Sequence, residues 1–246
     1  MPNYLVFICL ALCILTTGLF LYFRVKKGGI AGLFSKTIAS VCFILLAVVS
    51  STTKTNTSYY GSVAISMFIL GLVCGLIGDI LLDQKVMYEF HSTQYLRAGM
   101  ISFSVAHVFN IVGLLSLANT QAEILKSNLL ELGLVVLGAL IATVITYFFS
   151  TKVQKLNFEK NTWFVNCYTF ILMLTTILSI YLCFVLGLDF WQMIMLAVGL
   201  VFFLASDLVL SIQYFGGKQD NKTLIVVNHT LYYLAQIIIA FTIFFI

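Results

Sequence analysis

The sequence contains very little charge. Only 9% of its 246 residues are Asp, Glu, Lys or Arg, whereas soluble proteins have roughly 25%. Hydrophobic residues make up 61% of the chain, and its mean hydropathy is +1.08. A chain of this composition cannot cover its apolar surface with a water-facing shell. Because Pro2 is the only proline, helices without proline kinks are expected.

Two further classes of protein are excluded by what is missing. No segment combines clustered Lys and Arg with interleaved aromatics, so a nucleic-acid partner is not expected. The six cysteines lie inside apolar runs and form no CxxC pair. Cysteines placed in this way usually pack as small hydrophobic residues, so we expect neither a disulfide framework nor a metal site. Nothing in the sequence calls for a cofactor.

Apolar runs of about 20 residues, the length that crosses a bilayer, recur along the whole chain. We predict an all-α membrane bundle that forms one domain over residues 1–246. The first run has no basic region before it and no cleavage site after it, so it is expected to be retained as a span. The eight predicted spans are 4–23, 31–50, 61–82, 98–118, 129–149, 163–186, 190–215 and 222–246.

The distribution of basic residues supports this count independently, since Lys and Arg favour cytoplasmic loops. The odd-numbered loops contain ten Lys or Arg residues and the even-numbered loops contain two, Lys54 and Lys126. This alternation predicts that both termini lie on the non-cytoplasmic side. The host would be a bacterial inner membrane or, in a eukaryote, the endoplasmic reticulum.

Ionisable groups inside a bilayer are costly and usually face a cavity or another polar group. With the predicted topology, every such group falls in the cytoplasmic half of its span. This pattern predicts a polar cavity that opens toward the cytoplasmic leaflet. The polar residues that we expect around it are Lys36, Asp79, Asp83, His107, Asn110, Asn166, Tyr168, Asp207, Asn228, His229, Tyr232, Tyr233 and Gln236.

Simpler explanations exist for several of these residues. Lys36 could extend its ammonium group to the lipid headgroups, and Asp83 could simply end a helix. The tyrosines could be packing residues, and either histidine could be structural. Asp79 and Asp207 are harder to explain in this way, because a buried carboxylate needs a partner or a proton.

Four segments together make the chain similar to a known family. GLVCGLIGDILLD (71–83), FSVAHVFNI (103–111), GLVFFLASDLVLSIQYF (199–215) and TLYYLAQIIIAF (230–241) resemble the YhhN family of eight-span membrane proteins. Lys36, Tyr168 and the Ser206 of the SD motif also match family positions. Asn110 departs from the pattern, because an aromatic residue is expected there. The characterised members are lysoplasmalogenases, so the resemblance implies hydrolysis of the vinyl ether bond of a lysophospholipid, without a cofactor.

Cleavage of a vinyl ether begins with protonation of carbon and passes through an oxocarbenium ion, so it needs an acid, a base and nearby negative charge. Our hypothesis makes Asp79 and Asp207 the acid/base pair, with the two roles unassigned, as in glycoside hydrolysis. His107 or His229 would orient water, and Lys36 would contact the phosphate. The remaining predicted substrate contacts are Asp83, Asn110, Tyr168, Ser206, Tyr232, Tyr233 and Gln236.

Two other classes fit part of this pattern. A proton-coupled transporter of small molecules or lipids also carries carboxylates and histidines in its spans, but its polar groups should continue to the outer side. A metal-dependent hydrolase could use the histidines and aspartates as ligands, but no HxxxH or HExxH spacing is present. A purely structural membrane protein is the remaining alternative.

Overall fold

The computed structural model describes residues 3–53, 57–121, 128–187 and 189–246. Within these ranges it is entirely helical, and eight helices are long and apolar enough to cross a membrane, which confirms the predicted spans. The long helices are α1 (Tyr4–Lys26), α2 (Gly29–Thr52), α3 (Tyr59–Met87), α4 (Ser92–Ala118), α6 (Leu129–Phe148), α7 (Thr162–Leu186), α8 (Trp191–Phe215) and α9 (Lys222–Thr242). Four short turns are η1 (Glu89–His91), η2 (Phe149–Val153), η3 (Glu159–Asn161) and η4 (Ile243–Phe245).

Local sequence explains several helix ends. Ser58 caps α3 by accepting a hydrogen bond from the Gly61 amide, and Asn221 caps α9 by accepting from the amides of Thr223 and Leu224. Gly187 ends α7 with a φ of 80°, a conformation that glycine adopts without strain. The sequence therefore contains stop and start signals as well as apolar runs.

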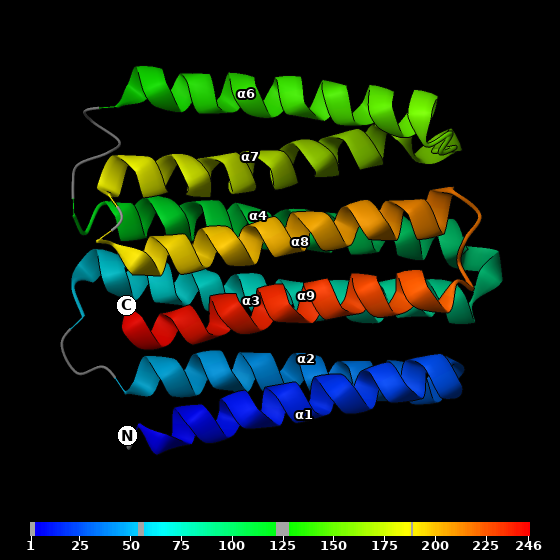
Figure 1. Cartoon of the computed structure of the whole chain (residues 1–246), viewed down its shortest axis with the longest axis horizontal. Coiled ribbons are helices and arrows are strands. Elements are labelled where there is room, and N and C mark those ends of the chain that lie inside the picture. The colour runs from blue at the N-terminus through cyan, green and yellow to red at the C-terminus, as the bar shows by residue number, and fades with distance from the viewer. Residues whose placement is uncertain (1–2, 54–56, 122–127, 188) are drawn as a thin grey trace.

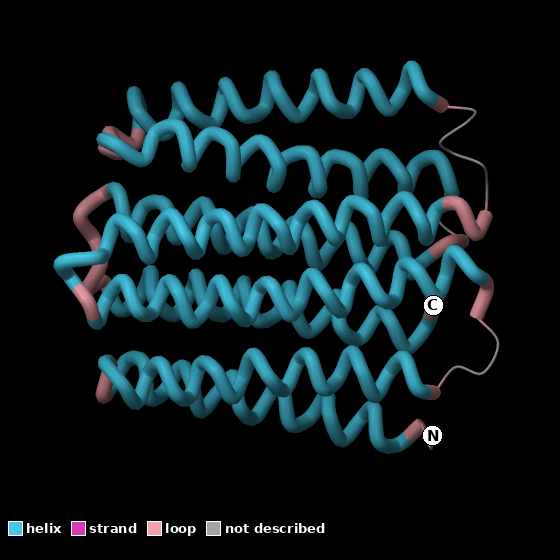
Figure 2. Tube along the Cα trace, turned by 180° about the vertical axis from the view of Figure 1, so that it is seen from behind, coloured by secondary structure: helices cyan, strands magenta, loops and turns pink. Residues whose placement is uncertain are grey.

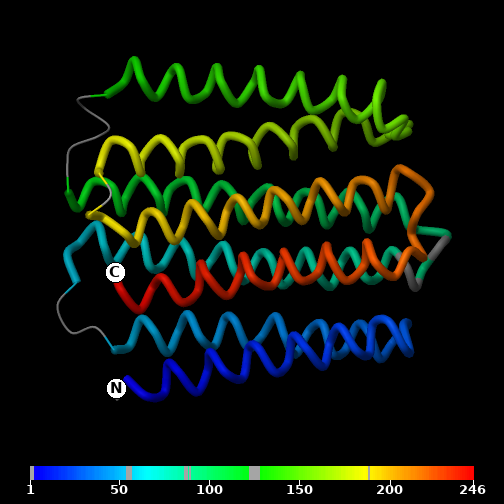
Figure 3. The backbone as a smooth tube through the Cα atoms, in the orientation of Figure 1, coloured from blue at the N-terminus to red at the C-terminus, as the bar shows by residue number. Residues whose placement is uncertain are grey.

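Consecutive long helices run antiparallel, so their connections alternate between two ends of the bundle (Figures 1 and 2). The α1–α2, α3–α4, α6–α7 and α8–α9 connections share one end, which we call the basic end. The chain begins and finishes at the other end (Figure 3). The two termini therefore lie on the same side of the bundle, as predicted, while the assignment of that side to the non-cytoplasmic face stays a prediction.

Glycines bring α3 and α4 close together. A Cβ atom on Gly78 of α3 would lie 2.7 Å from the ring of Phe103 on α4, and one on Gly99 of α4 would lie 2.7 Å from the Leu82 side chain on α3. Small residues allow membrane helices to approach in this way, since lipid supplies no hydrophobic force to drive them together. The close α3–α4 contact fixes the position of Phe103, which lines the candidate site.

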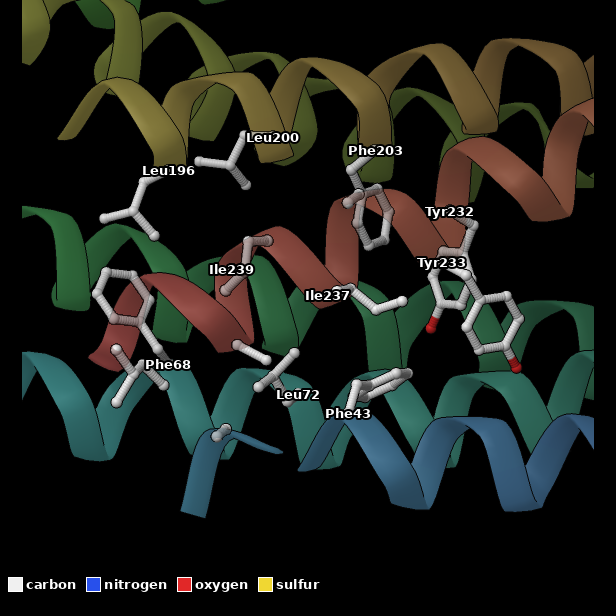
Figure 4. Close-up of a cluster of buried hydrophobic side chains, with 14 of the residues drawn as sticks. Phe43, Phe68, Leu72, Leu196, Leu200, Phe203, Tyr232, Tyr233, Ile237 and Ile239 are labelled. Atoms are coloured by element: carbon white, nitrogen blue, oxygen red, sulfur yellow. The ribbon is translucent and has the colours of Figure 1, made fainter. Parts of the chain in front are cut away.

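The buried core extends through the whole bundle, and its central part lies among α2, α3, α4, α8 and α9. Figure 4 shows its buried side chains, with Phe68 and Leu196 at one side and Tyr232 and Tyr233 at the other. Helix α6 packs mainly on α7 at the edge of the bundle. Large apolar side chains such as Leu130 and Phe184 point outward and are 81% exposed, as expected for a surface in contact with lipid.

Candidate active site

Three buried charged side chains and one half-buried arginine, from three helices, form an ion-pair cluster near the basic end. The Lys36 ammonium of α2 lies 3.1 Å from Oδ1 of Asp79 and 3.4 Å from Oδ1 of Asp83, both on α3. Arg24 of α1 donates to both carboxylate oxygens of Asp83, to Oδ1 at 3.0 Å and to Oδ2 at 3.2 Å. We name Arg24, Lys36, Asp79 and Asp83 the ion-pair cluster.

Hydroxyl groups complete the environment of Asp79. Its Oδ2 atom accepts hydrogen bonds from Ser40 Oγ at 2.7 Å and from Tyr232 Oη at 2.8 Å. The hydroxyl of Tyr233 lies 3.0 Å from Ser40 Oγ and donates to the Lys36 carbonyl oxygen at 3.0 Å. Asp79 therefore has an ammonium and two hydroxyls as partners, which is what an ionised carboxylate needs away from water.

The ion-pair cluster tests the simpler explanations of two residues, which were headgroup contact for Lys36 and helix termination for Asp83. The Lys36 side chain is 4% exposed and is paired with two carboxylates, so it does not extend to the headgroups. Helix α3 continues past Asp83 to Met87, so Asp83 does not end the helix. The Lys36 ammonium thus already has two anionic partners, and its predicted contact with a phosphate stays a prediction.

Asp207 has a different environment. It lies on α8, and its Oδ2 atom accepts a hydrogen bond from the hydroxyl of Tyr168 on α7. Among the described residues, no Lys or Arg forms an ion pair with it. Asp79 is near enough for an electrostatic interaction with Asp207, but the hydrogen bonds of the two carboxylates go to different side chains.

Asp207 and Tyr168 line a partly open pocket between α4, α7 and α8, with the end of α6 and η2 on one side. We name it the acid pocket. Its empty space measures about 820 Å³, including its open part, and it is narrow, because the centre of a water molecule fits in only about 80 Å³ of it. Its walls are mostly apolar and include Leu96, Met100, Phe103, Leu172, Leu204 and Leu208.

His107 is buried beside the acid pocket without a polar partner. Its ring centre lies 4.6 Å from that of Phe203 and 6.3 Å from that of Tyr168. Neither ring nitrogen has a hydrogen-bond partner among the described residues. Unsatisfied buried groups of this kind are costly and therefore uncommon, so these nitrogens are available to bind a water molecule or a substrate oxygen.

Aromatic rings connect the ion-pair cluster with the acid pocket. The Tyr232 ring, whose hydroxyl donates to Asp79, contacts Phe103 at 6.1 Å and Phe203 at 5.4 Å between ring centres. Phe103 also lines the acid pocket. In place of the single predicted cavity, the structure has two neighbouring sites with an aromatic wall of Phe103, Phe203 and Tyr232 between them. Of the predicted acid/base pair, only Asp207 lines the acid pocket.

The other predicted residues lie around these two sites. His229 packs its ring against Phe20, 5.0 Å between centres, on the side of Lys36 and Arg24. Gln236 lies beside Tyr232, and Gly75 leaves room for both. Asn110 packs into the notch at Gly71, where a Cβ would lie 2.8 Å from its Oδ1. Ser206 donates to the Phe203 carbonyl of its own helix. Ser206 also interacts with the Asp207 carboxyl group. The roles in substrate binding predicted for Asn110 and Ser206 stay predictions.

Sequence reasoning missed Arg24 and Ser40. Arg24 was counted as a loop cation, although α1 continues through it to Lys26. A signal was present, because Asp79 and Asp83 lie one helical turn apart and bring two negative charges to a single lysine. Two negative charges away from water need a second cation to balance them. Arg24 is suited to this role, because it follows a predicted span that finishes at the same end of the bundle.

The described residues contain no group of three or more His, Cys, Asp or Glu side chains placed to hold a metal ion. The six cysteine thiols are all free, and three of them are buried. The side chains at this site offer carboxylates, hydroxyls and an imidazole.

Comparison with known proteins gives one match. Residues 31–243, nearly the whole chain, match the model of the YhhN family. No curated protein and no solved structure matches the chain significantly.

Proposed function

The chain belongs to the YhhN family, and from this membership and the acid pocket we propose that it hydrolyses the vinyl ether bond of lysoplasmalogens. The products would be a fatty aldehyde and a glycerophospho-base. The observation that carries the proposal is a single carboxyl group, Asp207, in a mostly apolar pocket of the membrane bundle. A single alkenyl chain needs apolar walls, and its vinyl ether needs a proton donor.

The proposed reaction starts with proton transfer from Asp207 to the vinyl carbon remote from the ether oxygen. The resulting oxocarbenium ion is stabilised by the carboxylate that remains. Water then adds to the carbon bonded to oxygen, and Asp207 takes a proton from that water. Collapse of the hemiacetal breaks the bond to the glycerol oxygen, which takes up a proton and leaves as a hydroxyl. One water molecule is consumed and no cofactor is used.

Asp207 suits the role of acid better than Asp79 does. Asp79 lies 3.1 Å from the Lys36 ammonium and accepts two hydroxyl hydrogen bonds, all of which favour its ionised form. Asp207 has the Tyr168 hydroxyl and apolar walls, and it lines the space where a substrate would lie. Tyr168 would orient the Asp207 carboxyl group.

The proposal gives the ion-pair cluster and His107 supporting roles. Asp79 holds Tyr232, and Tyr232 packs on the Phe103 ring that lines the pocket, so the cluster is a positioning element for the pocket wall. The free nitrogens of His107 would bind the attacking water. Negative charge on Asp79 would also act on the oxocarbenium ion from behind the aromatic wall.

The test is to incubate purified protein with a lysoplasmalogen and, separately, with the matching ester lysolipid. The proposal predicts fatty aldehyde from the first and no fatty acid from the second, because an ester has no vinyl carbon to protonate. Fatty acid release from the ester would instead indicate a lysophospholipase. If neither lipid is cleaved and the protein carries a proton-coupled solute flux in liposomes, the transporter alternative replaces the proposal.

A further inference from the structure

A second cavity adjoins the acid pocket at the basic end of the bundle. It encloses about 640 Å³, including its open part, and shares Leu96, Phe158, Tyr214 and Phe215 with the acid pocket. Its remaining lining is polar: Lys85, Ser92, Thr93, Asn157, Glu159 and Asn161. We name it the polar cavity. The two spaces together have an apolar part deeper in the bundle and a polar part at its end. A lysophospholipid is divided in the same way, into an apolar chain and a polar headgroup.

Lys85 differs from Lys36 in having no anionic partner. Its ammonium lies over the Tyr214 ring, 3.4 Å from the ring centre. Among the described residues, no carboxylate forms an ion pair with it, although Glu159 lines the same cavity. A cation held by an aromatic face keeps its hydrogen-bond donors available for a ligand. The charge of Lys85 is therefore free to bind an anionic group.

One wall of the polar cavity is fixed by Arg97. Its Nε atom donates to Asn161 Oδ1 at 2.9 Å, and its Nη2 atom donates to the Lys160 carbonyl at 2.9 Å. The Glu159 carboxylate accepts from Asn157 Nδ2 at 3.3 Å. Within the described part of the chain, the cavity thus presents one cation without an ion pair, Lys85, and, on its η3 side, the carboxylate of Glu159.

We propose that the polar cavity binds the phosphate-containing headgroup of the substrate. Lys85, with the hydroxyls of Ser92 and Thr93, binds the phosphate, and Glu159 faces the ammonium of a zwitterionic headgroup. This inference deepens the proposed function and depends on it for the identity of the lipid. Lys85, and not Lys36, then binds the phosphate, and the polar cavity prefers zwitterionic to anionic headgroups.

The spacing along α8 agrees with this assignment. Asp207 lines the acid pocket, and Tyr214, which holds Lys85, lies seven residues farther along the same helix. Seven residues correspond to roughly 10 Å of helix. The glycerol backbone of a lysoplasmalogen separates its vinyl ether from its phosphate by a distance of the same order. One lipid can therefore place its vinyl ether at Asp207 while its phosphate lies at Lys85.

The first test measures binding, so that it does not depend on turnover. A non-hydrolysable alkyl-ether lysophosphatidylethanolamine is titrated into the purified protein in nanodiscs. Lys85→Met should weaken its binding about tenfold, the effect of losing one charge-assisted hydrogen bond. Lys85→Arg keeps the charge and should bind within about threefold of the unmodified protein. Lys152→Met, at an exposed position of η2 at the same end of the bundle, is the matched control and should bind normally.

The second test concerns the headgroup. Glu159→Gln should bind the ethanolamine lipid more weakly and the matching alkyl-ether phosphoglycerol lipid, which is anionic, more tightly than the unmodified protein does. Asp220→Asn, at an exposed position of the same end, should change neither affinity. An alkylglycerol without phosphate should bind equally to the unmodified protein and to Lys85→Met.

Unchanged binding in Lys85→Met, or an equal loss in Lys85→Met and Lys152→Met, would overturn the inference. Equal affinities of the Glu159→Gln protein and the unmodified protein for both lipids would overturn its headgroup part. These outcomes are distinct from failure of the proposed function, which would show as an absence of aldehyde release from a protein whose lipid binding still depends on Lys85.

Discussion

Lys36 is held between Asp79 and Asp83 where water does not reach, and this makes its charge structural. Removing one member of a buried ion pair leaves an uncompensated charge and typically costs 3–5 kcal/mol. Lys36→Met should therefore lower the free energy of unfolding by about that amount, because two carboxylates then share only Arg24. Adding Asp79→Asn should recover part of the loss. Thermal unfolding of the purified single and double variants measures both, and equal stability of Lys36→Met and the unmodified protein would refute the structural role.

Replacing His107 by Phe should lower activity without lowering stability. Its two ring nitrogens have no hydrogen-bond partner in the ranges that the structure describes, and its ring packs on Phe203. His107→Phe keeps an aromatic ring and removes the unsatisfied nitrogens, so stability should be unchanged or slightly higher. Aldehyde release should fall by roughly 10²–10⁴-fold if the imidazole binds the attacking water. A variant that is less stable and fully active would show that His107 is only a packing residue.

The candidate residues could be predicted from the sequence because burying a charged side chain is costly and therefore needs a reason. Asp79, Asp207 and Lys36 were selected because lipid cannot solvate them. Asp79 and Lys36 are buried, Asp207 is half-buried, and each has a polar partner. Which partner each one has could not be read from the sequence. The division of Asp79 and Asp207 between two sites depends on where the Phe103 and Phe203 rings pack, and the sequence specifies their apolar character but not their positions.

Helix α3 shows how one element controls the pocket through its glycines. A methyl group at Gly78 would lie 2.7 Å from the Phe103 ring, so the ring must move, and Phe103 lines the acid pocket. Gly78→Ala should cost about 1–3 kcal/mol of stability through overpacking and should lower aldehyde release by up to about 100-fold through displacement of the wall.

Gly138→Ala is the matched control for this variant. Nothing lies within 4 Å of a Cβ at Gly138 of α6, so this substitution should leave activity unchanged. It should raise stability slightly, because alanine favours the helix more than glycine does. Thermal unfolding and aldehyde assays on the two variants separate an effect of the α3–α4 contact from a general effect of replacing glycine in a helix. Similar losses in both would contradict the role given to Gly78.

Hydropathy predicted the elements well and their ends less well. The third predicted span, 61–82, belongs to a helix that runs from Tyr59 to Met87, and the fourth begins at Ser92 instead of residue 98. Helices continue past the apolar run because backbone hydrogen bonds are satisfied within the helix in any solvent. The polar cavity lies among these helical extensions and the turn at η3. It could not be predicted, because Lys85, Ser92 and Glu159 were all assigned to loops.

For the whole molecule, the predicted orientation places the basic end in the cytoplasm. The odd-numbered connections lie at this end (Figure 1). The polar cavity lies there too, because it is lined by Lys85, Ser92 and Glu159 beside these connections. In bacterial cells that express the protein in the inner membrane and are treated with a membrane-impermeant thiol reagent, Tyr59→Cys, at an exposed position near the opposite end, should be labelled. Lys218→Cys, exposed in the α8–α9 connection, should be labelled only after the cells are opened. The reverse pattern would place the substrate entrance in the other leaflet.

The proposed function depends most directly on Asp207 as the proton donor of the acid pocket. The decisive measurement is the rate of aldehyde release from lysoplasmalogen by Asp207→Asn, with Asp220→Asn as the exposed control and thermal unfolding to confirm that both variants are folded. The variant should retain less than about 1% of the unmodified rate, since an amide cannot supply the proton, and the control should retain full activity. A folded Asp207→Asn protein that releases aldehyde at the unmodified rate would contradict the mechanism.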